Sequence, residues 1–308
     1  MRQKMRKIEK LWQEIEADTT IGSGTVIRRY GAQFHTPLFV AIRRKDLKRC
    51  LAFEFKMRDS SNGIEKIGIK GIEIEVIDNP NGGYYLLLML TESDNNSIFS
   101  SLAEDLIFSI KNDATELEGI RLIHQRVLIW KAIFDDLIFE GLSINAQVGL
   151  FAELSFLEML ISCESVQLGN AVRSWVGPNS GNRDFEIGGW AVEVKASRTN
   201  NHQKILISNE RQLDSTLLNS LFLSFFSLEM QQSAGLTLNM KVSAIRALLK
   251  NRPAEAFDFE RKLVLSGFLD KHLARYDENG FQIRSNICYH VDIGFPCISE
   301  SDLPTGVG

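Results

Sequence analysis

The chain has 308 residues, of which 44% are hydrophobic and 24% charged, and its formal net charge is −4. The negative charge argues against a stand-alone, non-specific DNA binder, and four scattered cysteines without a CxxC pair argue against structural zinc or a disulfide framework. The basic residues 1–7 precede no apolar segment, and the apolar runs 84–90 and 221–226 are too short to span a membrane, so we expect a cytoplasmic protein with no membrane association.

The first part of the chain predicts a small antiparallel α+β domain over residues 1–112. Apolar residues at helical spacing predict helices over 8–17 and 97–111. Apolar or alternating runs predict strands at 37–43, 50–56, 67–77 and 84–90. Residues 116–139 again carry apolar side chains at helical spacing, so we expect a linking helix within 113–141 that packs against both halves.

The remainder, 142–308, mixes helices and strands, which predicts an α/β core with a mixed sheet in a chain that is α+β overall. Helices are expected at 146–162, at 209–213 after a Ser208 cap, at 240–250 and at 254–266. Strands are expected at 171–176, 184–187, 190–195, 205–207, 217–228 and 281–292. Gly188-Gly189 between two alternating runs predicts a hairpin turn, because both turn positions need a positive φ.

This hairpin brings together side chains that can bind a divalent cation. On its second strand Glu193 and Lys195 share one face, whereas Val192 and Val194 share the other. The turn brings Asp184 near the polar face. Two carboxylates and an amine at one place suit a hard cation and a neighbouring water molecule. The alternative is an ordinary surface hairpin with a cross-strand ion pair.

Glu-x-Lys occurs three times, at 54–56, 193–195 and 260–262, so the tripeptide alone is not specific. The first copy follows Asp46, which lies among basic residues and is interpreted as a charge-balanced turn residue. The third copy lies in a charged helix and is expected to be solvated. Glu153 falls within the apolar run of the 146–162 helix. A carboxylate there is costly to bury unless it is paired or metal-bound, and the alternative is a partly exposed helix glutamate.

The order and spacing of these elements resemble the PD-(D/E)XK, or restriction-endonuclease-like, nuclease superfamily. The likeness rests on GLFAELSFLEML, AVRSWVGP, RDFEIGGWAVEVKASR and ISNERQLD, and it is best over residues 149–214. It is nearest to a bacterial family of PD-(D/E)XK proteins encoded with restriction or phage-defence genes, whose members extend beyond the end of this chain. One departure is Asn182-Arg183, where the superfamily name has a proline before the aspartate.

The resemblance implies a metal-dependent endonuclease that hydrolyses phosphodiester bonds in DNA as part of a restriction or defence system. It implies that Asp184, Glu193 and the Val194 carbonyl hold Mg²⁺, for which Mn²⁺ can substitute. Glu153 would hold a metal-bound water or a second ion. Alternation places Glu186 on the same face as Asp184, so Glu186 is an alternative ligand.

The resemblance further implies that Lys195 orients or helps to deprotonate the attacking water, with Gln212 beside it. The candidate phosphate contacts are Arg183, Arg198 and Arg211. Double-strand cutting would favour two active sites and hence a homodimer, and other subunits of a defence system are expected partners. The alternatives are a non-catalytic nuclease-fold scaffold, a DNA-binding subunit of a larger complex, and an enzyme that acts on RNA.

Overall fold

The computed structural model describes residues 7–18, 24–31, 34–57, 63–110, 115–137, 140–179, 181–198, 205–207, 209–216, 218–232, 234–292 and 294–297. The chain forms two compact units, Met1–Phe139 and Glu140–Gly308. Each unit contains a five-stranded sheet with helices packed beside it, so the predicted α+β class is confirmed.

The first unit is built on an antiparallel sheet, sheet A, with the strand order β1-β2-β3-β5-β4. Its strands are β1 (Thr25–Tyr30), β2 (Leu38–Arg43), β3 (Lys48–Phe55), β4 (Ile72–Asp78) and β5 (Tyr84–Leu90). Three of the four strands expected here are confirmed, whereas the run predicted from residue 67 becomes a strand only at Ile72. Gly71 has a φ of 80° and interrupts the extended backbone, because this left-handed conformation favours glycine.

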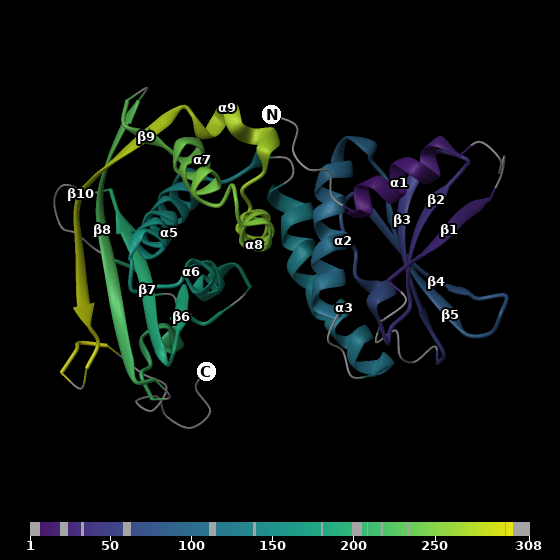
Figure 1. Cartoon of the computed structure of the whole chain (residues 1–308), viewed down its shortest axis with the longest axis horizontal. Helices are drawn as coiled ribbons and strands as arrows, with labels where there is room; N and C mark the ends of the chain where they lie inside the picture. The colour runs from purple at the N-terminus through teal and green to yellow at the C-terminus, as the bar shows by residue number, and fades with distance from the viewer. Residues whose placement is uncertain are drawn as a thin grey trace. The chain divides into compact units, whose positions relative to one another are not determined.

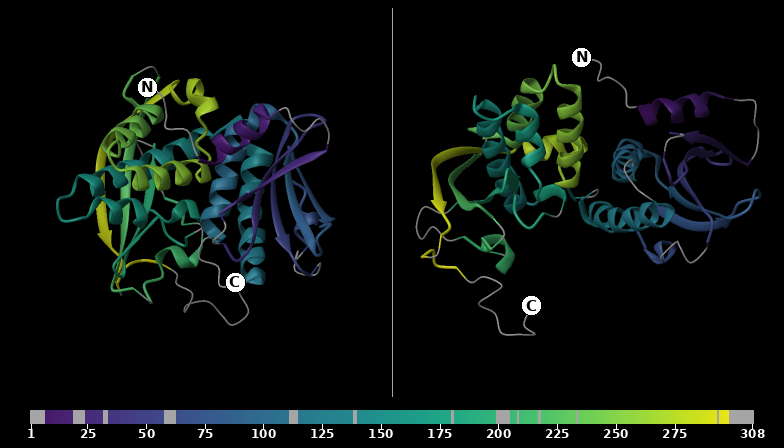
Figure 2. Two further views of the ribbon diagram at one scale, coloured as in Figure 1. Left: turned by 45° about the vertical axis from the view of Figure 1, so that its right-hand side comes forward. Right: turned by 60° about the horizontal axis from the view of Figure 1, so that its bottom comes forward.

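Among the described residues of the first unit, three helices pack together or on the sheet. They are α1 (Lys7–Ala17), α2 (Asn96–Ile110) and α3 (Glu116–Ala132), and the last continues into a π-helical turn, Ile133–Leu137. The α1 helix packs on β2, and α2 lies beside α3 in Figures 1 and 2. The fully buried Asp105 of α2 joins the pair, because it accepts hydrogen bonds from Arg126 (2.7 Å) and Trp130 (2.9 Å) of α3.

The second unit contains the mixed sheet B, with the strand order β6-β7-β8-β10-β9. Its strands are β6 (Phe185–Ile187), β7 (Trp190–Ser197), β8 (Ser220–Gln232), β9 (Leu236–Thr237) and β10 (Asn279–His290). The predicted hairpin is confirmed: Ile187 pairs with Trp190, and the two glycines between them have φ values of 58° and 85°. The neighbouring pair, β7 and β8, is parallel, whereas the other pairs are antiparallel.

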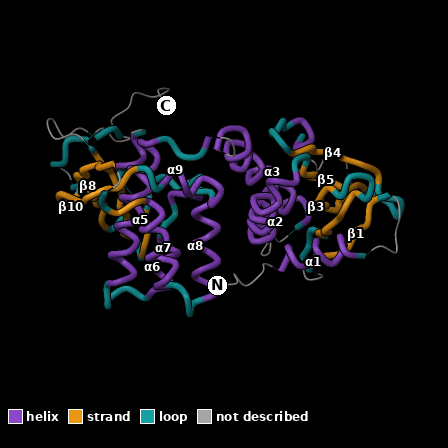
Figure 3. Tube along the Cα trace, turned by 90° about the horizontal axis from the view of Figure 1, so that it is seen from above, coloured by secondary structure: helices purple, strands orange, loops and turns teal. Residues whose placement is uncertain are grey.

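Helices pack beside sheet B, and in Figure 3 α5 to α8 lie on one side of it, with α8 farther from β8 and β10 than α5. They are α5 (Ile144–Ser162), α6 (Leu168–Ser174), α7 (Leu238–Leu248), α8 (Pro253–Leu265) and α9 (Leu273–Tyr276). The Ser143 side chain accepts the Ala146 N–H (3.3 Å) and so caps α5. Within the described part of the chain, α5 is the one helix long and apolar enough to cross a membrane, and 44% of its apolar window is buried inside the protein.

Two predicted strands in the second unit are wrong. Residues 171–176 were expected to be extended, but 171–174 lie in α6, where Leu168, Ala171 and Val172 recur at helical spacing. Residues 205–207 have no regular structure. Ser208 lies outside the described residues, and the side chain of Asn209 instead caps the short 3₁₀-helix Glu210–Leu213.

The third Glu-x-Lys copy was expected to be solvated, and this is wrong for its lysine. The side chain of Lys262 is only 2% exposed, and its Nζ donates to the Val172 carbonyl (2.7 Å) and the Arg173 carbonyl (3.2 Å). These carbonyls end α6 and lack helical partners, so the lysine satisfies them. Asp258 lies 3.1 Å from the same ammonium group and balances its charge.

Candidate functional site

The described part of the second unit contains a pocket of about 850 Å³ between α5, β7 and the end of β8. We call it the carboxylate pocket. Its lining residues are Asn145, Val148, Gly149, Glu153, Asp184, Glu193, Val194, Lys195, Ala196, Ser197, Arg198, Ile205, Leu206, Gln212, Glu229 and Met230. The structure therefore brings together the predicted residues Glu153, Asp184, Glu193, Lys195 and Gln212, which come from four separate segments of the chain.

Asp184 is fixed immediately before β6. Its Oδ2 accepts the Val194 N–H of β7 at 2.7 Å, so the side chain lies across the hairpin against the neighbouring strand. Its carbonyl accepts the N–H groups of Val176 (2.8 Å) and Gly177 (3.1 Å). A Cβ atom at Gly177 would lie 3.0 Å from Asp184 Oδ1, so a side chain there would crowd the carboxylate. No local sequence signal identified Gly177.

Glu193 is the most deeply buried acid of the pocket, with 1% of its surface exposed. Its Oε1 lies 2.7 Å from Lys195 Nζ, which confirms that the two side chains share a face of β7. Its Oε2 is buried and has no hydrogen-bond partner. Burial, and next the charge of Asp184, raise the pKa of Glu193 to about 7. An unsatisfied buried carboxylate oxygen is costly, so this atom is suited to a ligand.

Glu153 reaches the pocket from α5 and is held by Trp175. The indole Nε1 donates to Glu153 Oε2 at 2.8 Å, and the Trp175 side chain is fully buried. Burial, followed by the charges of Asp184 and Glu193, raises the pKa of Glu153 to about 8. Sequence reasoning missed this partner, because Trp175 was assigned to a strand with no site role.

The pocket holds more negative than positive charge. Burial also raises the pKa of Asp184, although the Val194 N–H and the Lys195 ammonium oppose this rise. Three carboxyl groups with raised pKa values thus surround one lysine, and a divalent cation would offset their repulsion. Among the described residues, no group of three or more histidine, cysteine, aspartate or glutamate side chains is placed to hold a metal ion. The donors available are two close carboxylates and backbone carbonyls, which suits an ion that keeps several water ligands.

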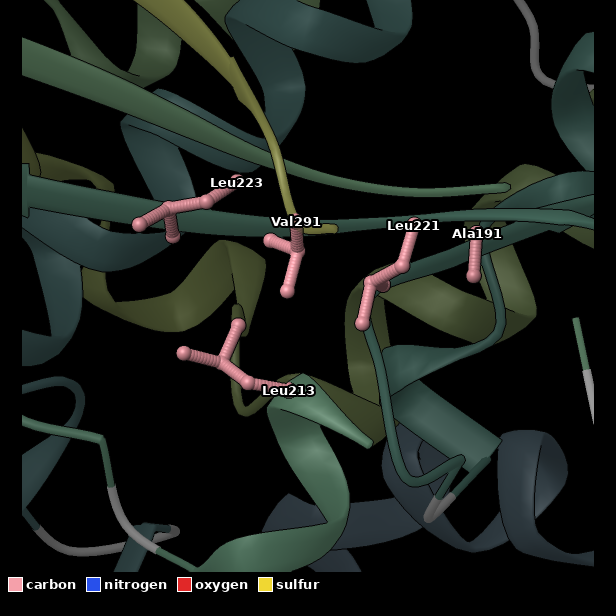
Figure 4. Packing of buried hydrophobic residues seen from close by; sticks show 5 residues of the cluster. All are labelled: Ala191, Leu213, Leu221, Leu223 and Val291. Carbon is pink, nitrogen blue, oxygen red and sulfur yellow. The ribbon is translucent and has the colours of Figure 1, made fainter. Parts of the chain in front are cut away.

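Gln212 is positioned by the 3₁₀-helix that follows β7. Its Oε1 accepts from Lys195 Nζ at 3.3 Å, so the lysine contacts both Glu193 and Gln212. The next residue, Leu213, anchors this segment in a buried apolar cluster with strands β7 and β8, which Figure 4 shows. The cluster contains Ala191, Leu213, Leu221, Leu223 and Val291. Apolar packing thereby holds an amide against the face of the hairpin that carries Glu193 and Lys195.

The predicted phosphate contacts do not lie together. Arg198 lines the pocket, where its guanidinium donates to Asn145 Oδ1 at 2.9 Å. Arg183 donates to the Asp214 carbonyl and lies 3.8 Å from Glu186, and neither Arg183 nor Glu186 lines the pocket. Arg211 is exposed outside it. The alternative ligand Glu186 therefore stands apart from the carboxylates that the structure brings together.

Comparison with known protein families identifies the family to which this chain belongs. A family model described as "Putative PD-(D/E)XK family member" (DUF4420) matches residues 8–308. The resemblance that was strongest over 149–214 is confirmed and extends over nearly the whole chain. It supports a nuclease-like fold. Searches of curated proteins and of solved structures returned no match.

Proposed function

Because this chain belongs to the DUF4420 family of PD-(D/E)XK proteins, we propose that it is a Mg²⁺-dependent DNA endonuclease. It would hydrolyse phosphodiester bonds in the bacterial cytoplasm, as part of a restriction or phage-defence system and together with other subunits of that system. The observation that supports this best is the convergence of Glu153, Asp184, Glu193 and Lys195 in one pocket.

The residues present fit a divalent metal ion. Glu193 Oε2 is buried without a hydrogen-bond partner, and Asp184 lies close enough to Glu193 to raise its pKa. Asp184, Glu193 and the Val194 carbonyl would hold Mg²⁺, and Mn²⁺ would substitute for it. When bound, such an ion lowers the pKa of a water molecule and offsets charge on the attacked phosphate.

The chain's own groups have separate tasks in this proposal. Lys195 is held between Glu193 Oε1 and Gln212 Oε1, so its ammonium is fixed where it can orient the attacking water and contact the phosphate. Glu153, with a pKa of about 8, can hold a proton or release one near neutral pH, and Trp175 fixes its orientation. Arg198, at the wall of the pocket, supplies a positive charge for a second phosphate.

A cleavage assay tests this proposal. Supercoiled plasmid is incubated with the wild type, Asp184→Ala and Lys195→Ala in Mg²⁺, in Mn²⁺ and in EDTA, with Lys56→Ala as a control from the first unit. We expect cleavage only with metal, a loss of about 10³-fold or more in the two pocket variants, and no change in the control. Equal cleavage by all four proteins would reject the proposal, and a labelled RNA in parallel identifies an RNA-directed enzyme.

A scaffold without activity is the second candidate, which the net charge of −4 favours. Calorimetry with Mn²⁺ separates the two candidates. If the chain is a nuclease, the wild type binds Mn²⁺ and Asp184→Ala does not. If it is a scaffold with an inactive pocket, neither protein binds Mn²⁺.

A further inference from the structure

Gly149 has no packing reason to be a glycine. It is the sixth residue of the 19-residue helix α5, and glycine is among the poorest helix formers. A Cβ atom built at this position would meet no heavy atom within 4 Å among the residues that the structure describes, so none of these approaches closely enough to exclude a side chain. Its φ is not in the left-handed region that favours glycine. The free space at Gly149 therefore requires another explanation.

The space beside Gly149 opens into the carboxylate pocket. Asn145, Gly149 and Glu153 are spaced four residues apart on α5, so they form one stripe along the helix. All three line the pocket. Glu153 marks the end of the stripe near the acids, and Asn145, which binds Arg198, marks the other end. We call the part of the pocket between these two ends the Gly149 groove.

The walls of the Gly149 groove differ from the carboxylate end. Val148 lies beside Gly149 on α5, and Leu206 and Met230 line the pocket from other segments, with 79% and 38% of their surfaces exposed; we call these two side chains the apolar wall. Exposed apolar side chains favour contact with a base or sugar rather than a phosphate. Arg198 stands at the end of this wall, next to Met230, and supplies the positive charge that a phosphate needs.

We propose that the Gly149 groove holds an unpaired nucleic acid strand next to the bond to be cleaved. The strand backbone would pass α5 at Gly149, with a base against the apolar wall and a phosphate at Arg198. The pocket lining contains four acids (Glu153, Asp184, Glu193 and Glu229) and two cations (Lys195 and Arg198). A duplex carries one negative charge per about 1.7 Å of its axis and a single strand one per about 3.4 Å, so a lining with more acids than cations repels a single strand less than a duplex. The inference rests on the nuclease proposal, and it specifies the substrate class.

Binding measurements in EDTA test the groove without cleavage. Fluorescence anisotropy compares a short labelled single strand with the matched blunt duplex, for the wild type, Gly149→Ala, Gly149→Leu and Ala146→Leu. Ala146 is an exposed residue of the same helix and lies outside the pocket lining, so its variant adds an equal side chain elsewhere. We expect the wild type to bind the single strand about tenfold more tightly than the duplex. Gly149→Leu should weaken that binding about tenfold or more, with Ala146→Leu unchanged.

Thermal unfolding separates a blocked groove from a damaged fold. Gly149→Ala should raise Tm by about 2–4 °C, because alanine favours the helix and meets no clash. If a side chain at position 149 raises Tm and also lowers the affinity for the single strand, this position is kept open for a ligand. Equal single-strand affinity of Gly149→Leu and the wild type would overturn the assignment of the groove to a single strand. Equal affinity of the wild type for single strand and duplex would overturn it as well.

The two proposals fail in different ways. If the wild type cleaves DNA but Gly149→Leu binds the single strand as the wild type does, the groove assignment is wrong and the nuclease stands. If Gly149→Leu loses single-strand binding but the wild type cleaves nothing in Mg²⁺ or Mn²⁺, the groove stands and the nuclease is wrong.

Discussion

Each unit of this protein carries a Glu-x-Lys segment at a strand, and the two have different surroundings. In the first unit, Glu54 of β3 accepts a hydrogen bond from Asn79 (2.8 Å). The upstream Asp46 is paired with Arg43 through two bonds (2.9 and 2.6 Å), and these bonds lower the pKa of Asp46 to about 2. Glu54 and Asp46 thus each have a hydrogen-bond partner within the first unit.

In the second unit the same tripeptide lies against other acids. Burial and the charge of Asp184 raise the pKa of Glu193 to about 7, and one oxygen of Glu193 has no hydrogen-bond partner. The chemistry of a Glu-x-Lys segment is thus decided by what the neighbouring elements bring to it. Arg43 and Asn79 satisfy the two acids of the first unit, whereas a helix that contributes Glu153 leaves negative charge in excess in the second.

The largest expected difference between the two segments is in cleavage. Glu193→Gln keeps the shape of the side chain but removes its charge, so we expect activity to fall about 10³-fold in Mg²⁺. Glu54→Gln is the matched change in the first unit and should leave activity within about twofold. Plasmid nicking rates measure both. A comparable loss of nicking activity in Glu193→Gln and Glu54→Gln would mean that the effect is not specific to the carboxylate pocket.

Metal binding should show the next largest difference. At a Mn²⁺ concentration about 100-fold above Kd, binding stabilises the folded state by about 2.7 kcal/mol, which raises Tm by roughly 5–10 °C. Asp184→Ala should remove this rise, whereas Asp46→Ala should keep it, because Asp46 is already paired with arginine. Differential scanning fluorimetry with and without Mn²⁺ measures the shift. A rise that survives in Asp184→Ala contradicts the assignment of the metal to the hairpin.

The pH dependence of stability should also separate the units. The pKa values of Glu153 and Glu193 rise from 4.5 to about 8 and about 7, so the folded protein holds protons that the unfolded chain has released. The contribution of these two groups to the stability of the metal-free protein is therefore greatest below about pH 4.5, and it is lost as the pH rises towards 8. Denaturant titrations in EDTA should show this fall. Glu153→Gln should reduce the slope, and Glu54→Gln should leave it as in the wild type.

The smallest expected effect concerns two buried tryptophans. Trp175→Phe removes the donor to Glu153, and since that bond lowers the pKa of Glu153, its loss raises the pKa further. One hydrogen bond contributes about 0.5–1.5 kcal/mol, so we expect cleavage to fall about 3–10-fold, with a shifted pH profile. Trp130→Phe removes the donor to Asp105 of the first unit and should lower Tm without changing cleavage. A Trp175→Phe enzyme with an unchanged pH profile would contradict a role in positioning Glu153.

The hairpin could be predicted from the sequence because its signals are local. Gly188-Gly189 sets the turn, and alternation then places Glu193 and Lys195 on one face. Glu153 was identified because a carboxylate in an apolar helix is conspicuous. Gln212 came from the family resemblance alone, since only the packing of the following leucine brings it to the lysine.

The missed features depend on contacts between distant segments. The apolar run 171–176 is compatible with a strand or a helix, and the buried Lys262 of α8 favours the helix by binding its last carbonyls. Trp175 reaches Glu153 only because α6 ends where the chain pairs with Phe185. Gly177 matters only because Asp184 approaches its backbone. No pattern within a short window encodes such approaches.

The parallel pairing of β7 and β8 has a consequence for where this protein tolerates changes in length. The strand β7 leads from Trp190 to Ser197, yet β8 begins beside Trp190, so the chain must travel back roughly 23 Å at about 3.3 Å per residue. On this return path Gln212 is fixed by hydrogen bonding to Lys195, and Leu213 by apolar packing. The crossover has the polar composition of a permissive surface loop, but an affinity tag or a deletion placed there would pull Gln212 away from Lys195 and disturb the carboxylate pocket.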